Sequence, residues 1–263
     1  MLKIDIRGQA MNKVARVIMD RPAVHNAFNE ELIALLTDVF TDLAQKADIR
    51  AVVIAGTGKS FSAGADLHWM KRMAENTREE NLRDAKTAAR MFLAVATCPK
   101  PVIARVHGAA LGGGAGLIAA CDIAVAVESA QFGFTEVKVG IIPSIISPFV
   151  LAKIGPAHAR EYFLTGERFP AAVARDIGLV QHVVKDEAAM DALIEAKIAE
   201  ILTSSPEAVR MAKQLIFSVV GRPPESVLDL TAEAIARARA TDDARAGFAA
   251  FLARSKPPWA PPS

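Results

Sequence analysis

Residues 104–122 read Ala-Arg-Val-His-Gly-Ala-Ala-Leu-Gly-Gly-Gly-Ala-Gly-Leu-Ile-Ala-Ala-Cys-Asp. The apolar run that leads into this stretch, residues 101–104, predicts a buried strand, and residues 123–127 predict another. Between them lie a glycine turn at 112–114 and a short helix. Glycine lacks a Cβ, so a ligand can come close to the backbone there, and the free N–H groups at a helix N-terminus favour an anion. The stretch therefore predicts a site for a phosphate, a carboxylate or a developing oxyanion.

A membrane span or a nucleotide fingerprint accounts poorly for the glycines of this chain. The uncharged run from Gly108 to Cys121 has fourteen residues, whereas a membrane span needs about 20. A dinucleotide fingerprint fails because Leu117 stands at its third glycine, and a phosphate loop at 56–60 fails because Val53 stands at its first glycine. Close packing of backbone without a ligand stays open as the structural alternative.

Length and composition place the chain among ordinary globular proteins. It has 263 residues, 52% of them hydrophobic, and a net charge of +2, which suits one large domain or a domain with an appended segment. The charge balance gives no indication of a nucleic-acid partner. Cys98 and Cys121 have no metal-ligand spacing, so we expect buried thiols, a reducing compartment and no metal. The N-terminus alternates like a strand and predicts no signal or membrane segment, hence a cytoplasmic protein.

The order of elements predicts a mixed α/β core. Strands are expected at 2–9, 13–19, 50–55, 101–104, 123–127 and 179–184, with a short extended piece at 131–136. Helices are expected at 30–44, 66–73, 78–97, 113–120, 147–154, 157–164 and 170–176. From Asp186 onward the sequence predicts only helices, near 186–203, 205–219, 224–240 and 242–254. We therefore expect residues 1–185 to form the core and residues 186–263 to form an all-helical C-terminal segment.

Two small-residue turns share one form. Residues 62–66, Ser-Ala-Gly-Ala-Asp, and residues 109–115 each run into the start of a helix. If both turns present a bare backbone N–H to one point, they form an oxyanion hole that stabilises an enolate by several kcal/mol.

At this point the sequence resembles the enoyl-CoA hydratase/isomerase (crotonase) family. The matching motifs stand in the family's order over about residues 5–256: Asp20-Arg21-Pro22 with Asn26-Ala27, Phe61-Ser62-Ala63-Gly64-Ala65-Asp66-Leu67, Lys100-Pro101-Val102-Ile103-Ala104, His107-Gly108 with Gly112-Gly113-Gly114, Cys121-Asp122-Ile123, Phe132-Gly133 with Glu136, and Gly140-Ile141-Ile142-Pro143. The resemblance implies a ββα spiral core, C-terminal helices that build a homotrimer or a homohexamer, and an acyl-CoA thioester substrate. It implies no separate cofactor, because coenzyme A is part of the substrate.

The resemblance also assigns residues. The thioester oxygen is expected between the N–H groups of Ala65 and Gly113. Coenzyme A and substrate contacts are expected at Val24, His25, Ala63, Asp66, Leu67, His68, Gly112 and Gly116, and from a neighbouring subunit at Phe251 and Lys256. The chain departs from the family at Ala23, where a basic residue is common.

The main departure from the family's pattern is that one of two acidic residues is absent. Hydratases with two glutamates carry one where this chain has Gly116 and the second where it has Glu136. A single carboxylate can still move protons. It would either add water to an α,β-unsaturated thioester or shift a double bond by moving a proton between C4 and C2.

Two motifs favour hydration. Residues 65–70, Ala-Asp-Leu-His-Trp-Met, and residues 145–150, Ile-Ile-Ser-Pro-Phe-Val, resemble the methylglutaconyl-CoA type of hydratase. We therefore predict a hydratase of a branched glutaconyl ester, such as 3-methylglutaconyl-CoA or isohexenylglutaconyl-CoA, in leucine or acyclic terpene breakdown. The alternatives are a Δ3-Δ2 enoyl-CoA isomerase and a catalytically silent binding protein of the same fold. Lys71 and Arg72 are the candidates for binding the distal carboxylate.

Overall fold

Six strands form the larger sheet, in the order β1-β2-β3-β5-β7-β10. The computed structural model describes residues 1–261. The first two strands pair as an antiparallel hairpin, and the others run parallel to β2. The bounds are Leu2–Gln9 for β1, Asn12–Met19 for β2, Ile49–Gly56 for β3, Val102–Val106 for β5, Ile123–Val127 for β7 and His182–Val184 for β10.

Four short strands form a second sheet, in the order β4-β6-β8-β9. The first three are parallel and β9 is antiparallel to β8. The bounds are Ser60–Ser62 for β4, Ala109–Leu111 for β6, Gln131–Gly133 for β8 and Arg168–Pro170 for β9. None of the four spans more than three residues, so no alternation of apolar and polar residues marks them in the sequence. Of these four strands only β8 falls within an expected extended piece.

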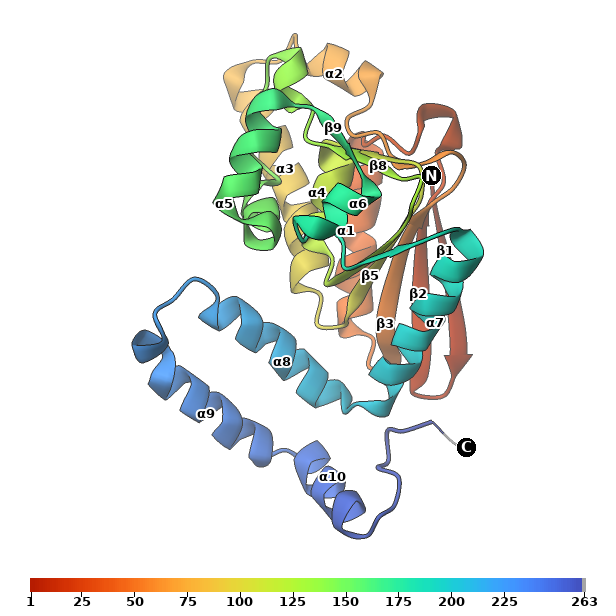
Figure 1. Cartoon of the computed structure of the whole chain (residues 1–263), viewed down its shortest axis with the longest axis vertical. Helices are drawn as coiled ribbons and strands as arrows, with labels where there is room; N and C mark the ends of the chain where they lie inside the picture. The colour runs from red at the N-terminus through yellow and green to blue at the C-terminus, as the bar shows by residue number, and fades with distance from the viewer. Residues whose placement is uncertain (262–263) are drawn as a thin grey trace.

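The helices complete the predicted repeat. Strands β3, β5 and β7 of the large sheet are each followed by a strand of the small sheet and then by a helix (Figure 1), which confirms the expected ββα spiral. The helices are α1 (Glu30–Gln45), α2 (Leu67–Met73), α3 (Arg78–Thr97), α4 (Gly113–Ala120), α5 (Ser147–Thr165), α6 (Ala171–Asp176), α7 (Glu187–Thr203), α8 (Pro206–Val219), α9 (Leu228–Arg239) and α10 (Asp242–Leu252), with short 3-10 turns η1 (Pro22–Val24), η2 (Glu136–Val139) and η3 (Pro224–Val227).

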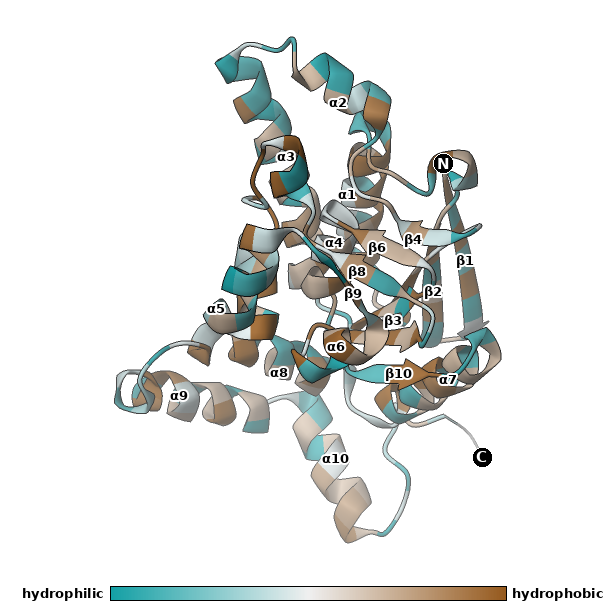
Figure 2. Ribbon diagram, turned by 45° about the horizontal axis from the view of Figure 1, so that its top comes forward, coloured by the Kyte–Doolittle hydropathy of each residue, from teal (hydrophilic) through white to brown (hydrophobic). Residues whose placement is uncertain are grey.

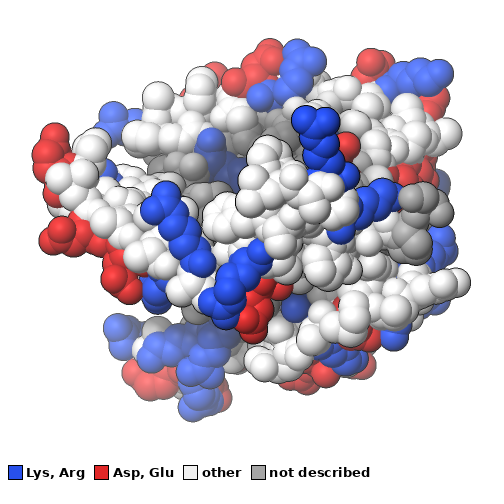
Figure 3. Space-filling view, turned by 90° about the horizontal axis from the view of Figure 1, so that it is seen from below, with Lys and Arg blue, Asp and Glu red and all other residues white. Residues whose placement is uncertain are grey.

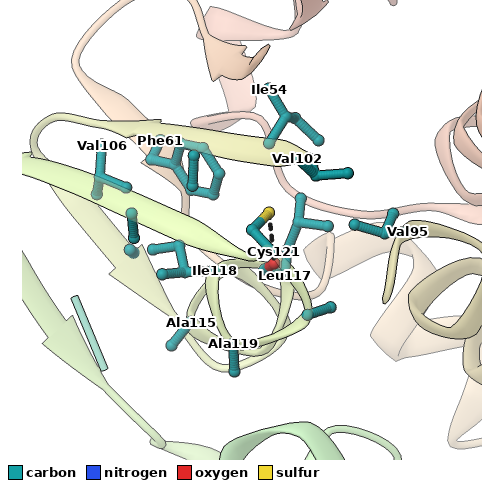
Figure 4. Packing of buried hydrophobic residues seen from close by; sticks show 14 of the residues in the cluster. Ile54, Phe61, Val95, Val102, Val106, Ala115, Leu117, Ile118, Ala119 and Cys121 are labelled. Atoms are coloured by element: carbon teal, nitrogen blue, oxygen red, sulfur yellow. Dashed lines mark hydrogen bonds between the residues drawn. The ribbon is translucent and has the colours of Figure 1, made fainter. Parts of the chain in front are cut away.

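Helix α4 lies at the centre of the core. Its residues from Gly114 to Ala120 are buried, and apolar side chains from β3, β5 and α3 surround it (Figure 4). The thiol of Cys121, just after the helix, donates to the carbonyl of Leu117 at 3.2 Å. A helix that is apolar on every side belongs in the interior of a protein. The glycine turn that precedes α4 is therefore held by the best-packed part of the molecule.

The last three helices leave this core. Figures 1 and 2 show α8, α9 and α10 extending away from the sheets. Helix α7, by contrast, packs on β7, β10, β3 and β5, and its Met190, Ile194 and Ile198 are buried. The first helix of the C-terminal helical segment thus covers the large sheet. Among residues 1–261 no helix is long and apolar enough to span a lipid bilayer.

Candidate active site

Three parallel strands of the small sheet end at one edge. Strand β4 leads into Ala63–Ala65, β6 into Gly112 and Gly113, and β8 into Glu136. The Gly112 N–H donates to the carbonyl of Gly133 at 2.8 Å. This bond joins the turn after β6 to the end of β8. Since the carboxyl ends of neighbouring parallel strands meet, turns that are far apart in the sequence face the same space.

That space is a cavity of about 350 Å³. Ala65, Gly113 and Glu136 all lie on its wall. The rest of the wall is largely apolar and comes from four regions: Phe28 and Ile33 at the start of α1, Leu67, Trp69, Met70 and Met73 of α2, Ala88, Met91 and Phe92 of α3, and residues 139–146. The structure thus brings together the three residues that the sequence assigned to catalysis.

The first turn presents the N–H of Ala65. Phe28 pairs with Ala65 as an isolated parallel bridge, whose two bonds run from the Phe28 N–H to the Gly64 carbonyl and from the Asp66 N–H to the Phe28 carbonyl. These bonds fix the turn and leave the Ala65 N–H without a partner among residues 1–261. Gly64 has a φ of +91°, and a Cβ there would lie 3.0 Å from the Leu111 carbonyl oxygen, so the turn requires glycine.

The second turn presents the N–H of Gly113. Gly113 is the first residue of α4, and the first intrahelical bond runs from the Gly116 N–H to the Gly112 carbonyl at 3.0 Å. The N–H of Gly113 therefore has no acceptor within the helix, and it lies at the positive end of the helix dipole. An N–H group of this kind is the donor type that an oxyanion requires.

Glu136 is the acidic residue on the cavity wall. Its Oε2 is buried and has no hydrogen-bond partner among the described residues. Burial raises the pKa of the Glu136 carboxyl above the ordinary range of a glutamate. A Cβ at Gly112 would lie 3.2 Å from Oε1 of Glu136, so the glycine leaves the carboxylate room beside the second turn. A carboxyl with a raised pKa is suited to both accepting and returning a proton.

Gly116 does not have the role that we expected. It is absent from the cavity wall, and a Cβ there would lie 2.1 Å from Cγ2 and 2.6 Å from Cβ of Ile146. The buried Ile146 side chain therefore fills the space that a second acid would need. The glycine permits close packing of α4 against the start of α5 and does not widen the pocket. Sequence reasoning missed Ile146, because only the fold brings it beside a residue so much earlier in the chain.

The expected coenzyme A segment lies directly beside the first turn. The His25 carbonyl accepts the Ala63 N–H at 2.9 Å, and the His25 ring contacts the Ser60 hydroxyl at 3.0 Å. Val24 is half-buried and Leu67 and His68 are exposed, so these positions can meet a large ligand. Ala23, at the departure from the family, is exposed as well.

Asp66 instead has a structural role through its side chain. It accepts from the His68 N–H at 2.9 Å and so caps α2, and it pairs with Arg21 at 2.9 Å. Burial opposes its charge, but the bonds from Arg21 and the backbone hold the pKa of Asp66 below its usual range. A side chain engaged in this way is not available to a ligand.

Four further residues lie away from the cavity. Lys71 and Arg72 are absent from its wall, and Arg72 donates to both carboxylate oxygens of Glu30 at 2.7 Å, so neither side chain faces the cavity in this structure. Phe251 is 81% exposed on α10, and neither it nor Lys256 lines the cavity of its own chain. Their expected role toward a neighbouring subunit stays a prediction.

Comparisons with known proteins find relatives of one family in sequence and in fold. Residues 9–262 match the sequence model of the enoyl-CoA hydratase/isomerase family. A crystal structure of an enoyl-CoA hydratase from Shewanella pealeana ATCC 700345 is 37% identical with a TM-score of 0.93, covering 98% of this chain and 95% of that one. The short-chain-enoyl-CoA hydratase of Clostridium acetobutylicum is 33% identical over 93% of both chains. The peroxisomal Delta(3,5)-Delta(2,4)-dienoyl-CoA isomerase of Arabidopsis thaliana is 30% identical over 97% of this chain and 95% of its own.

Proposed function

Since the chain belongs to the enoyl-CoA hydratase/isomerase family, we propose that it adds water to an α,β-unsaturated acyl-CoA, with Glu136 as its only acid–base residue. The observation that carries the proposal is the meeting of Ala65, Gly113 and Glu136 on one cavity. Two backbone donors and one carboxyl group are the groups that such a reaction needs.

The steps balance with one carboxylate. Glu136 accepts a proton from water while the water oxygen forms a bond to Cβ. The electron pair of the double bond moves onto the thioester oxygen, where the N–H groups of Ala65 and Gly113 stabilise the enolate. Glu136 then returns its proton to Cα, and the double bond has gained one water.

Replacement of the acid tests this proposal. Glu136→Gln keeps the shape of the side chain but cannot accept a proton, so kcat should fall by roughly 10²–10⁴-fold with little change in KM. Glu128 is exposed and lies in the turn directly after β7. Glu128→Gln is the matched control and should retain full activity. Near-normal hydration by Glu136→Gln would refute the assignment.

One observation favours double-bond isomerisation as a second candidate. Ile146 replaces a second acid with an apolar wall, and moving a proton from C2 to C4 through Glu136 needs no water. The two reactions have opposite optical signatures. A 2-enoyl-CoA loses its enoyl absorbance on hydration, whereas a 3-enoyl-CoA gains that absorbance on isomerisation. If the absorbance of neither thioester changes, the chain is a binding protein of the same fold.

We further propose a branched glutaconyl ester as the substrate and a trimer or a dimer of trimers as the assembly. The substrate proposal is supported by the motifs at residues 65–70 and 145–150, both of which contribute to the apolar cavity wall. Turnover of short- and long-branched glutaconyl-CoA esters, measured against crotonyl-CoA, is the test. Equal rates on all of them would reject the substrate proposal and leave the reaction type standing.

A further inference from the structure

A second cavity, of about 290 Å³, lies at the amino ends of β3 and β5 and shares no wall residue with the first. Lys100, which lies between α3 and β5, lines this cavity together with Arg50 and Arg210. Most of the remaining wall is apolar and comes from Met11, Ile49, Pro99, Pro101, Ile201 and Pro206. The proposed hydration uses none of these residues, so the three cationic side chains on an apolar wall have no role in it.

The ammonium group of Lys100 is unpaired and accessible. It makes no hydrogen bond or ion pair with any of residues 1–261, and the side chain is half-buried. The fully enclosed polar side-chain atoms without a partner in this part of the chain are Nε1 of Trp69, Nδ1 of His107 and Oε2 of Glu136. Nζ of Lys100 is not among them, so it is open to solvent and to reagents.

The carboxylates on the same wall are engaged with other groups. Glu207 forms an ion pair with Arg210, and Asp243 accepts from the Ser205 hydroxyl at 2.5 Å. Neither carboxylate lies within ion-pair distance of Lys100. The ammonium form of Lys100 therefore has no counter-ion in this cavity.

The surroundings of Lys100 favour its neutral amine. Burial lowers the pKa of Lys100 below the ordinary lysine range, and the positive charges of Arg50 and Arg210 act in the same direction. Asp48 opposes this shift, as Cys98 does when it is a thiolate. A lysine that is partly desolvated beside other cations is a stronger nucleophile at neutral pH than a solvated one.

We propose that Lys100 is an acylation site at which this chain reacts with acyl-CoA thioesters. Nζ attacks the thioester carbonyl carbon, a C–N bond forms and the C–S bond breaks. The amine proton leaves with coenzyme A as its thiol, and Lys100 carries an uncharged amide whose acyl chain can pack on the apolar wall. The step needs no other reactant. It rests on the proposed function only for its acyl donor, which is the substrate class of that function.

Butyryl-CoA tests the proposal, because this saturated thioester cannot be hydrated. After incubation of the unaltered protein at pH 7.5, peptide mass spectrometry should show butyryl groups forming on Lys100 at least about threefold faster than on Lys86. Lys86 is the control within the same chain, since it is exposed on α3 and lines neither cavity. Equal rates at the two lysines, or no adduct on Lys100, would overturn the proposal.

The variant Arg210→Gln tests whether the cations of the cavity activate Lys100. It removes one guanidinium and frees Glu207, so butyrylation of Lys100 should slow by about threefold or more and its half-maximal rate should move to higher pH. Lys86 should react as before. An unchanged rate and pH profile at Lys100 would contradict this activation. Loss of acylation with crotonyl-CoA hydration intact rejects the role of Lys100 alone, whereas absence of hydration with acylation intact rejects the proposed reaction alone.

Discussion

Oε2 of Glu136 is buried and has no hydrogen-bond partner among residues 1–261, and this costs stability once the residue is charged. Its pKa is raised by burial, so the folded state holds the proton at pH values where the unfolded chain has released it. The contribution of Glu136 is therefore most favourable below the ordinary glutamate range and is lost as pH rises through the raised pKa.

We accordingly expect Glu136→Gln to raise the melting temperature at pH 7.5 and to have little effect at pH 4. Thermal unfolding of both proteins across this range measures the difference. Glu128→Gln should show no such pH dependence. A melting-temperature gain for Glu136→Gln that is the same at every pH would contradict a buried charge at this position.

Gly116 and Ile146 form a second residue-scale case. In a helix interior alanine is preferred over glycine by about 1 kcal/mol. Here the added Cβ would lie 2.1 Å from Cγ2 of Ile146, and overpacking costs about 1–3 kcal/mol. Gly116→Ala should therefore lower the free energy of unfolding, against the helix propensity.

Denaturant unfolding of a double-mutant cycle checks this. Ile146→Ala alone removes a buried side chain, at a cost of about 2–5 kcal/mol. The double variant should lose less free energy of unfolding than the sum of the losses of the two single variants. The methyl group introduced by Gly116→Ala then occupies part of the vacated space. Additive costs would mean that Ile146 already moves aside in the single variant.

At the scale of elements, the sequence predicted the long helices and the strands of the large sheet but, of the small sheet, only β8. Strands such as Ser60–Ser62 and Ala109–Leu111 are too short to show a period, and they exist because of pairing with residues far along the chain. The two turns were nevertheless predicted as donor sites, since Gly64 and Gly112–Gly113 mark them directly. Their convergence on one cavity required the parallel pairing of β4 with β6, which no local pattern encodes.

The start of α4 permits a sharp test of the oxyanion hole. Gly113 is the first residue of the helix, a position where proline is tolerated because its N–H is unused by the helix. Gly113→Pro should therefore fold yet lose at least about 10²-fold in kcat. Gly113→Ala is the matched control, since it adds the same Cβ near the Phe28 ring and keeps the N–H. If both variants lose activity equally, crowding by the Cβ and not the missing donor is the cause.

At the scale of the whole molecule, the described chain leaves a large apolar surface uncovered. Exposed apolar side chains recur along α8, α9 and α10 and the turns that join them, namely Ile216, Phe217, Val220, Leu228, Ile235, Phe248, Phe251 and Leu252. Seen from below, uncharged surface lies between scattered charges of both signs (Figure 3). Contiguous exposed apolar surface on a protein marks an interaction site, which agrees with the proposal that these helices join copies of the chain.

A substitution at Leu252 tests whether these helices join copies of the chain, with little effect on the fold of a single copy. It is 80% exposed, so Leu252→Asp should not destabilise the fold of one copy but should place an unpaired charge in an interface between copies. Light scattering should then report a lower mass than for the unaltered protein. Leu164→Asp, at a side chain that is 77% exposed on α5, is the control and should retain the mass.

Because Phe251 and Lys256 are expected to reach a neighbour's coenzyme A, dissociation should also raise KM for the thioester. An unchanged mass with Leu252→Asp would refute the interface, and a lower mass with unchanged KM would refute the shared coenzyme A site while leaving the assembly intact.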